Sequence, residues 1–131
     1  MVFITNQAGI AEGRISKDDF WHIHGEVLRL LEPSGVKVLK TYMNGEAAGP
    51  NATEWRKPGP KMLLQAAKEF NLKLEDVYMV GDSEGDIHAA LNAHCKGGIL
   101  VETATNKKVV SPDAAYSAPH LIDAVKYVVN N

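Results

Sequence analysis

The chain has 131 residues, of which 45% are apolar, so it is long enough for one compact domain with a core and too short for two. Fourteen basic and sixteen acidic residues leave a formal net charge of −2, which excludes a general positive field that would attract nucleic acid or an anionic membrane. The single cysteine, Cys95, excludes an intrachain disulfide framework and a multi-cysteine zinc site. We therefore expect one domain over residues 1–131, and the lone cysteine, which fits a reducing compartment, favours the cytoplasm. No apolar run is long enough to span a membrane and the first residues do not resemble a signal peptide, so we expect no membrane contact.

Segments typical of strands and of helices alternate along the chain. Short apolar or β-branched runs predict strands at residues 2–4, 36–43, 77–80 and 98–101, and a short one near 115–116. Helical periodicity after the capping pair Ser16 and Asp19, and again from about 58, 86–94 and 119–129, predicts the helices, the last with Val125, Val128 and Val129 in the core. This alternation indicates an α/β fold with a parallel sheet covered on both faces. In such sheets the functional residues gather in loops at the carboxyl ends of the strands.

Three polar segments follow predicted strands or lie in the loops between elements: Thr5-Asn6-Gln7-Ala8-Gly9-Ile10, Arg56-Lys57-Pro58 and Gly81-Asp82-Ser83-Glu84-Gly85-Asp86. A hydroxyl and backbone amides at a strand end can hold a phosphate oxygen, and a lysine places a positive charge beside the same group. Asp82 and Asp86, four residues apart, can both turn toward one magnesium ion, directly or through water. Together the three segments predict a site for phosphate and Mg²⁺ suited to phosphoryl transfer.

Each segment also has a purely structural interpretation. Thr5 and Asn6 could form an ordinary turn at a strand end, and Lys57 could be a solvated surface residue. Asp82 and Asp86 could simply cap the following helix, since acids favour the amino end of a helix. The phosphate-site interpretation depends on the joint presence and order of the three segments.

The same three segments resemble the second, third and fourth motifs of the haloacid dehalogenase (HAD) superfamily, and the resemblance covers nearly the whole chain. Within it, Ile4-Thr5-Asn6-Gln7-Ala8-Gly9-Ile10, Arg56-Lys57-Pro58-Gly59-Pro60 and the turn at Gly81 look like the group that contains histidinol-phosphate phosphatases, heptose-bisphosphate phosphatases and polynucleotide 3′-phosphatase domains. The resemblance implies a doubly wound, Rossmann-like sheet of the HAD type. It also implies a magnesium-dependent phosphatase that forms an aspartyl-phosphate.

The resemblance assigns roles to polar residues in each of the three segments. Thr5 and Asn6 would hold the transferring phosphoryl group, with Gln7 also in contact with the substrate. Lys57 would neutralise charge on the phosphate, and Arg56 would contact the rest of the substrate. Asp82 would bind Mg²⁺, and Asp86 would support that metal site.

The sequence departs from the family pattern in two ways. The family's first motif, an Asp-x-Asp that supplies the nucleophile and the general acid, does not occur in this chain. We therefore expect the chain alone to have little or no phosphatase activity. In the family the strand that carries this motif lies between the strand of Thr5 and the strand of Asp82, so its loss would leave sheet edges through which the chain could associate.

The second departure concerns the loop before Arg56. Histidinol-phosphate and heptose-bisphosphate phosphatases commonly hold zinc there with cysteines, whereas residues 44–55 contain no cysteine or histidine. This favours the zinc-free relatives, including polynucleotide 3′-phosphatases, in which case a nuclear location becomes an alternative to the cytoplasm.

Three classes of function remain open from the sequence. The first is a phosphomonoesterase whose substrate is a phosphorylated small molecule or a nucleic-acid 3′-phosphate end. The second is a non-catalytic remnant that binds phosphate or Mg²⁺ and has a regulatory or partner-binding role. A response-regulator receiver fits less well, because the Arg56-Lys57-Pro58 segment is foreign to it.

Overall fold

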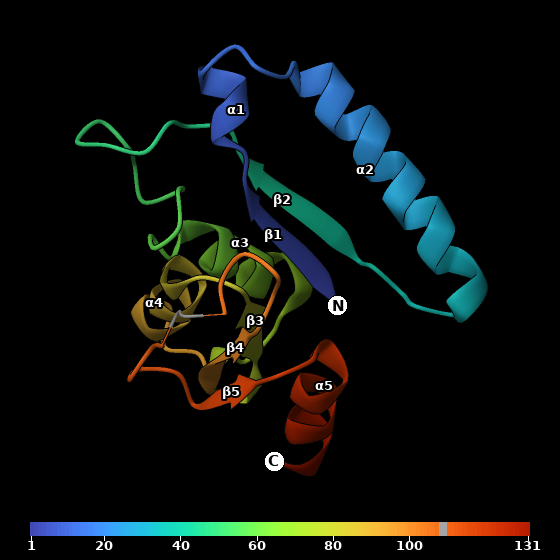
Figure 1. Cartoon of the computed structure of the whole chain (residues 1–131), viewed down its shortest axis with the longest axis vertical. Helices are drawn as coiled ribbons and strands as arrows, with labels where there is room; N and C mark the ends of the chain where they lie inside the picture. Colours follow the sequence, from blue (N-terminus) through green and yellow to red (C-terminus); the bar gives the residue numbers. More distant parts are fainter. Residues whose placement is uncertain (108–109) are drawn as a thin grey trace. The chain divides into compact units, whose positions relative to one another are not determined.

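The computed structural model describes residues 1–107 and 110–131, and it divides the chain into two compact units, Met1–Arg56 and Lys57–Asn131 (Figure 1). The first unit contains β1, α1, α2 and β2, and the second contains α3, β3, α4, β4, β5 and α5. All strand pairs are parallel. The α/β class and the parallel pairing predicted from the sequence are therefore confirmed, while a single domain over residues 1–131 stays a prediction.

In the first unit, two parallel strands are joined by two helices. Strand β1 (Val2–Asn6) pairs with β2 (Lys40–Asn44) along its whole length. Helix α1 (Ala8–Ala11) lies in the segment that was predicted as a loop, and α2 (Lys17–Leu31) is followed by a short 3-10 helix, Glu32–Ser34. Because β2 returns beside β1 in parallel, the carboxyl ends of both strands lie at the same edge of this sheet.

Strand β2 is shorter than the predicted strand 36–43. It begins at Lys40, opposite Val2, the first residue of β1. Before that point the structure gives two bonds between the segments, both to Met1: Leu39 N donates to Met1 O at 2.8 Å, and the Met1 ammonium group donates to Lys37 O at 3.3 Å. A strand needs a ladder partner, and residues 36–38 precede the start of β1 in the register, so their β-branched composition does not make them a strand.

Helix α2 begins with the predicted capping box. The Ser16 hydroxyl accepts from Asp19 N at 3.0 Å, and the Asp19 carboxylate accepts from Ser16 N in return. The helix packs on the strands through Phe20, which is buried, and His24, which stacks on Phe20 at 5.6 Å and hydrogen-bonds the Thr41 hydroxyl at 2.6 Å. Figure 1 shows α2 running alongside the pair of strands.

The second unit has a three-stranded parallel sheet in the order β3-β4-β5, formed by Tyr78–Gly81, Gly97–Val101 and Tyr116–Ala118. Its helices are α3 (Lys61–Phe70), α4 (Glu84–Asn92) and α5 (Leu121–Asn130), with a short 3-10 helix at Leu74–Asp76. All three α-helices were predicted, but each starts at another residue, α5 at Leu121 and not at about residue 119. Helix α3 starts after the Pro58-Gly59-Pro60 turn, and α4 starts two residues before Asp86 because Ser83 is its N-cap.

The core of the second unit surrounds β4. Ile99, Ala118 and Ala124 are completely buried together, and Tyr127 of α5 stacks on Tyr116 at 4.6 Å. Helix α5 thus faces the sheet through its Ala124 and Tyr127 side. The prediction that the valines of this helix lie in the core is wrong: Val125, Val128 and Val129 are 48%, 36% and 77% exposed, because Ala124 and Tyr127 make the contact of α5 with the core of this unit.

The strands form two separate sheets, one in each unit. Among the described residues, β1 pairs only with β2, and β3 pairs only with β4. Both strands therefore have an edge with no strand partner in the part of the chain that the structure describes. No helix in residues 1–107 and 110–131 has the length and the apolar character needed to cross a membrane.

Candidate functional site

The first predicted segment lies at the carboxyl end of β1. Thr5 and Asn6 are the last two residues of the strand, and Gln7 is the N-cap of α1. The side-chain amide of Gln7 donates to the Thr5 hydroxyl at 2.8 Å, and Gln7 N donates to Asn44 O at 2.7 Å. The Thr5 hydroxyl accepts this bond, so its own proton is available for an anion. A hydroxyl can accept one hydrogen bond and donate another, so this arrangement is compatible with the predicted role of Thr5 at a phosphate oxygen.

A second group of contacts shapes the loop between β2 and Arg56. The Glu46 carboxylate accepts from the Thr53 hydroxyl at 2.7 Å and from Thr53 N at 3.1 Å, and Arg56 donates from Nη1 to Glu46 O at 2.7 Å. These bonds fold the loop back on itself and hold the guanidinium of Arg56 against its start. The hydrogen bond from the Thr53 hydroxyl, with smaller help from Asn44 and the charge of Arg56, lowers the pKa of Glu46 below its usual range against an opposing effect of burial.

The lowered pKa of Glu46 predicts that this loop opens at acidic pH. A carboxyl group whose pKa is lower in the folded state than in the unfolded state stabilises the folded state at pH values above the unfolded pKa. This stabilisation is lost as the pH falls through the pKa of the folded state. We expect the amide proton of Thr53 to move upfield in NMR spectra as the pH falls below the usual range of a glutamate. In Glu46→Gln the movement should vanish, and an identical titration in that variant would show that another group is responsible.

In the second unit, Lys57 and Asp86 form a buried ion pair. The distance from Lys57 Nζ to Asp86 Oδ1 is 2.5 Å, and the two side chains are only 13% and 5% exposed. The other oxygen, Oδ2, accepts from Asp82 N at 3.1 Å, from Ser83 N at 3.1 Å and from the Ser83 hydroxyl at 2.8 Å. One carboxylate thus joins the lysine, the exit of β3 and the first turn of α4.

The position of Asp86 depends on Gly81, the last residue of β3. A Cβ at residue 81 would lie 2.3 Å from both Cγ and Oδ2 of Asp86, which no side chain tolerates. A glycine at this place therefore lets the carboxylate approach the backbone. The sequence predicts Gly81 only as part of a sharp turn; the signal for its closer role is the Ser83-x-x-Asp86 spacing, which forms a capping box in the structure and brings Asp86 back toward Gly81.

Asp82 is exposed, and its carboxylate has no hydrogen bond or ion pair with another described residue. Mg²⁺ prefers oxygen ligands and is often bound by one or two carboxylates together with waters and substrate phosphates. Asp82 fits such a site as a direct ligand. Both oxygens of Asp86 are occupied, and the described residues contain no group of three His, Cys, Asp or Glu side chains that could hold a metal, so a direct bond from Asp86 to the metal stays a prediction.

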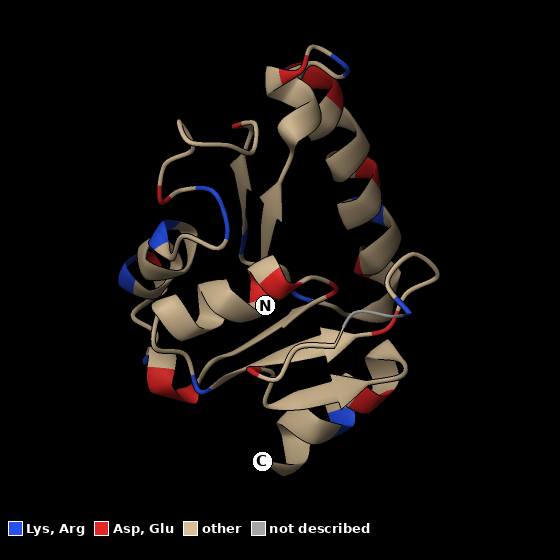
Figure 2. Ribbon diagram, turned by 60° about the vertical axis from the view of Figure 1, so that its left-hand side comes forward, with Lys and Arg blue, Asp and Glu red and all other residues tan. Residues whose placement is uncertain are grey.

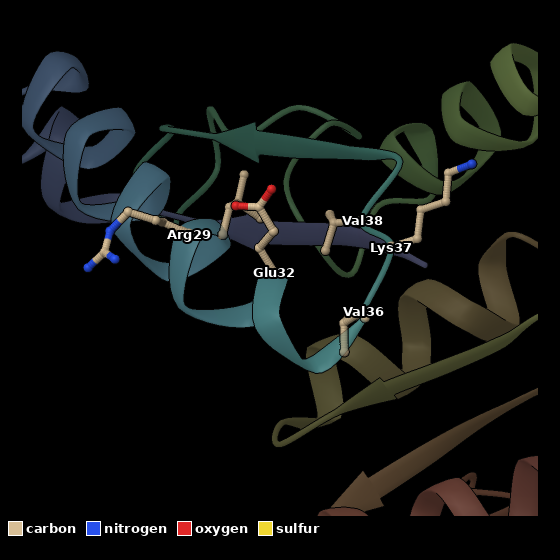
Figure 3. Close-up of a pocket in the computed structure, with 7 residues that line it drawn as sticks. Arg29, Glu32, Val36, Lys37 and Val38 are labelled. Carbon is tan, nitrogen blue, oxygen red and sulfur yellow. The ribbon is translucent and has the colours of Figure 1, made fainter.

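Two surface features do not belong to the predicted site. Basic and acidic residues are interspersed along the ribbon of each unit (Figure 2). In the first unit, a shallow hollow of about 490 Å³ lies between the end of α2 and the segment before β2 (Figure 3). Its charged residues are Arg29, Glu32 and Lys37, and none of the predicted site residues lines it.

The comparisons with known proteins come from sequence and from structure. A family model described as HAD-hydrolase-like matches residues 54–128. The D-glycero-beta-D-manno-heptose-1,7-bisphosphate 7-phosphatase of Pasteurella multocida is 32% identical over 130 residues, which cover 95% of this chain and 69% of the relative. The enzyme of the same name from Helicobacter pylori is 33% identical over 98% of this chain and 72% of its own length.

Among solved structures, the crystal structure of D,D-heptose 1,7-bisphosphate phosphatase from B. bronchiseptica, in complex with magnesium and phosphate, has a TM-score of 0.87 to this chain. The sequences are 28% identical, and the match covers 98% of this chain and 73% of that one.

Proposed function

Because this chain belongs to the HAD-like hydrolases and resembles their phosphatase members over nearly its whole length, we propose that it carries the phosphate- and magnesium-binding part of a phosphomonoester hydrolase for a sugar phosphate. The observation that carries this proposal is the turn after β3. There a buried carboxylate holds Lys57 while the neighbouring carboxylate of Asp82 stays exposed and without a partner among the described residues.

The residues of this turn would act by charge and position. Asp86 Oδ1 holds Lys57 Nζ at 2.5 Å. The ammonium group of the lysine would therefore already be fixed in place when a phosphate oxygen binds beside it. Asp82 would hold Mg²⁺, whose chemistry is to neutralise the charge that develops on a transferring phosphoryl group. In the first unit, Thr5 would donate its hydroxyl proton to a phosphoryl oxygen, with Asn6 and Gln7 beside it and Arg56 directed to the rest of the substrate.

The proposed reaction requires a nucleophile that these 131 residues do not offer. An aspartate oxygen attacks the phosphorus atom and the ester bond to the sugar oxygen breaks, while the general acid of the same Asp-x-Asp motif gives its proton to the leaving alcohol. Water then hydrolyses the acyl phosphate, which releases inorganic phosphate and restores the carboxylate. The sequence has no Asp-x-Asp, and Asp86 is engaged in its ion pair, so we propose that the nucleophile comes from residues outside this sequence and that the chain alone is inactive.

The substrate class follows from the relatives and from charge. The relatives compared above are named for a heptose bisphosphate, which favours a phosphorylated sugar. A nucleic-acid 3′-phosphate is the weaker alternative, since a net charge of −2 gives no general positive field that would attract nucleic acid.

The test is hydrolysis of p-nitrophenyl phosphate, and then of a panel of sugar phosphates and a 3′-phosphorylated oligonucleotide, with Mg²⁺. We compare this chain with a form extended at its amino end by a strand that ends in Asp-x-Asp. We expect activity only in the extended form, and we expect Asp82→Ala to lower it by at least about 100-fold, whereas Asp123→Ala in α5 should leave it unchanged.

The contrary outcome identifies the second class of function. If the extended form is folded but hydrolyses no member of the panel, the chain is a non-catalytic protein that binds phosphate or Mg²⁺. If Asp82→Ala and Asp123→Ala are equally active, Asp82 is not the metal ligand.

A further inference from the structure

Asn106 lies in the loop between β4 and β5, and it is buried with 8% of its surface exposed. Its side-chain nitrogen donates to Asp82 O at 2.6 Å and to Val101 O at 2.9 Å. Its side-chain oxygen accepts from Thr103 N at 2.5 Å. The amide of one buried side chain therefore joins the exits of two adjacent strands.

The two hydrogen bonds from the Asn106 amide lie directly beyond the end of the backbone ladder between β3 and β4. The last paired residues of β3 and β4 are Gly81 and Leu100. Beyond them, the carbonyls of Asp82 and Val101 both accept from the side chain of Asn106. Buried polar side chains are stable only when hydrogen-bonded, and Asn106 meets this requirement by binding backbone that leads directly into the predicted metal site.

The backbone of Asp82 is thus held on both sides. Its N–H donates to Asp86 at 3.1 Å, and its carbonyl accepts from Asn106 at 2.6 Å. The carboxylate is the one polar group of residue 82 that is not engaged by another described residue. Fixed backbone groups on both sides limit the directions in which this carboxylate can point.

We propose that Asn106 is a positioning residue, which acts through the backbone of Asp82 to aim the Asp82 carboxylate at the metal. The inference rests on the proposed function, because it needs Asp82 to be a metal ligand. Partners that orient metal ligands from outside the first shell typically change metal affinity by about 10- to 100-fold when they are removed. Asn106→Ala is therefore expected to weaken metal binding at least about 10-fold without any change in the ligand itself.

The experiment is an NMR titration of the isotope-labelled chain with Mn²⁺, whose unpaired electrons broaden the signals of nearby residues. In the wild type we expect selective broadening over residues 81–86. Asp82→Ala should abolish it, and Asn106→Ala should shift it to at least about 10-fold higher Mn²⁺. Thr105→Ala is the matched control, because Thr105 lies in the same loop, is exposed, and among the described residues bonds only the Thr103 hydroxyl.

A second readout needs no metal. The carbonyl carbon of Asp82 should move upfield in Asn106→Ala, which loses the bond to it, and should stay in place in Thr105→Ala. If Asn106→Ala does not fold, Asn106→Ser is measured in its place, since a hydroxyl can still satisfy part of the loop but cannot bridge both carbonyls.

The outcomes separate this inference from the function on which it rests. If the wild type shows no selective broadening over residues 81–86, the proposed metal site at Asp82 is wrong. The proposed role of Asn106 is then wrong as well. If Asp82→Ala abolishes broadening but Asn106→Ala binds Mn²⁺ as well as the wild type does, the metal site stands and the positioning role is overturned. An unchanged Asp82 carbonyl signal in a folded Asn106 variant overturns it as well.

Discussion

Asp86→Ala is expected to lower the free energy of unfolding of the second unit by about 3–5 kcal/mol, the effect of removing one partner of a buried ion pair. The substitution takes away the carboxylate that pairs with Lys57, where only 13% of the lysine side chain is exposed. It also removes the acceptor of Asp82 N, Ser83 N and the Ser83 hydroxyl. Urea unfolding followed by circular dichroism measures the loss.

The control for Asp86→Ala is a more solvent-accessible ion pair in the same unit. Asp123 Oδ1 and Lys126 Nζ lie 3.7 Å apart, and the two side chains are 27% and 66% exposed. Asp123→Ala should therefore lower the free energy of unfolding by about 0–1 kcal/mol. Equal losses in the two variants would mean that the Lys57–Asp86 pair contributes no more than a surface pair.

Gly81→Ala is the second substitution with a large expected effect, and it should lower the free energy of unfolding by about 3 kcal/mol. The new methyl group would lie 2.3 Å from the Asp86 carboxyl, so either the carboxylate or the backbone of β3 has to move. Both movements disturb the bonds to Lys57 and to the start of α4. Because the ion pair is lost without any change of charge, this variant also tests whether its geometry matters.

Gly85→Ala is the matched control for Gly81→Ala, because it adds the same methyl group four residues later. Among the described residues, the nearest atom that the new Cβ at residue 85 would meet outside the helix backbone is the Ser83 hydroxyl oxygen, at the ordinary contact distance of 3.6 Å. Since Gly85 lies inside α4, alanine should instead raise the free energy of unfolding by about 0.5–1 kcal/mol. A similar loss in both variants would show that the contact at Asp86 is not the cause.

The sequence predicted the elements well where a local signal marks them. The capping box at Ser16 and Asp19 located the start of α2, and the apolar run before Gly81 located β3. The errors arose where the outcome depends on distant partners. Residues 36–39 have strand composition, but β1 provides no ladder partner for them, and the valines of α5 follow an apolar pattern although only its Ala124 side reaches the sheet.

The sequence names the residues of the candidate site, but it does not predict the hydrogen bonds and the ion pair between them. Lys57, Asp82 and Asp86 were all named from the sequence, yet the pairing of Lys57 with Asp86 joins residues 29 positions apart and has no local signal. Asn106 was missed entirely. It lies 24 residues after the carbonyl that it binds, in a loop whose sequence shows no periodicity or motif, so only the folded chain reveals the contact.

In the turn after β3, some residues support the fold and another is available for the metal, and this difference affects how such a site changes in evolution. Gly81 and Asp86 are needed for the fold itself, because the carboxylate of Asp86 binds three groups of the turn and the absence of a side chain at Gly81 makes room for it. The carboxylate of Asp82 supports nothing else in the described part of the chain. Selection for folding alone would therefore keep Gly81 and Asp86 but let residue 82 drift, so that a lineage could lose the activity and still inherit the fold unchanged.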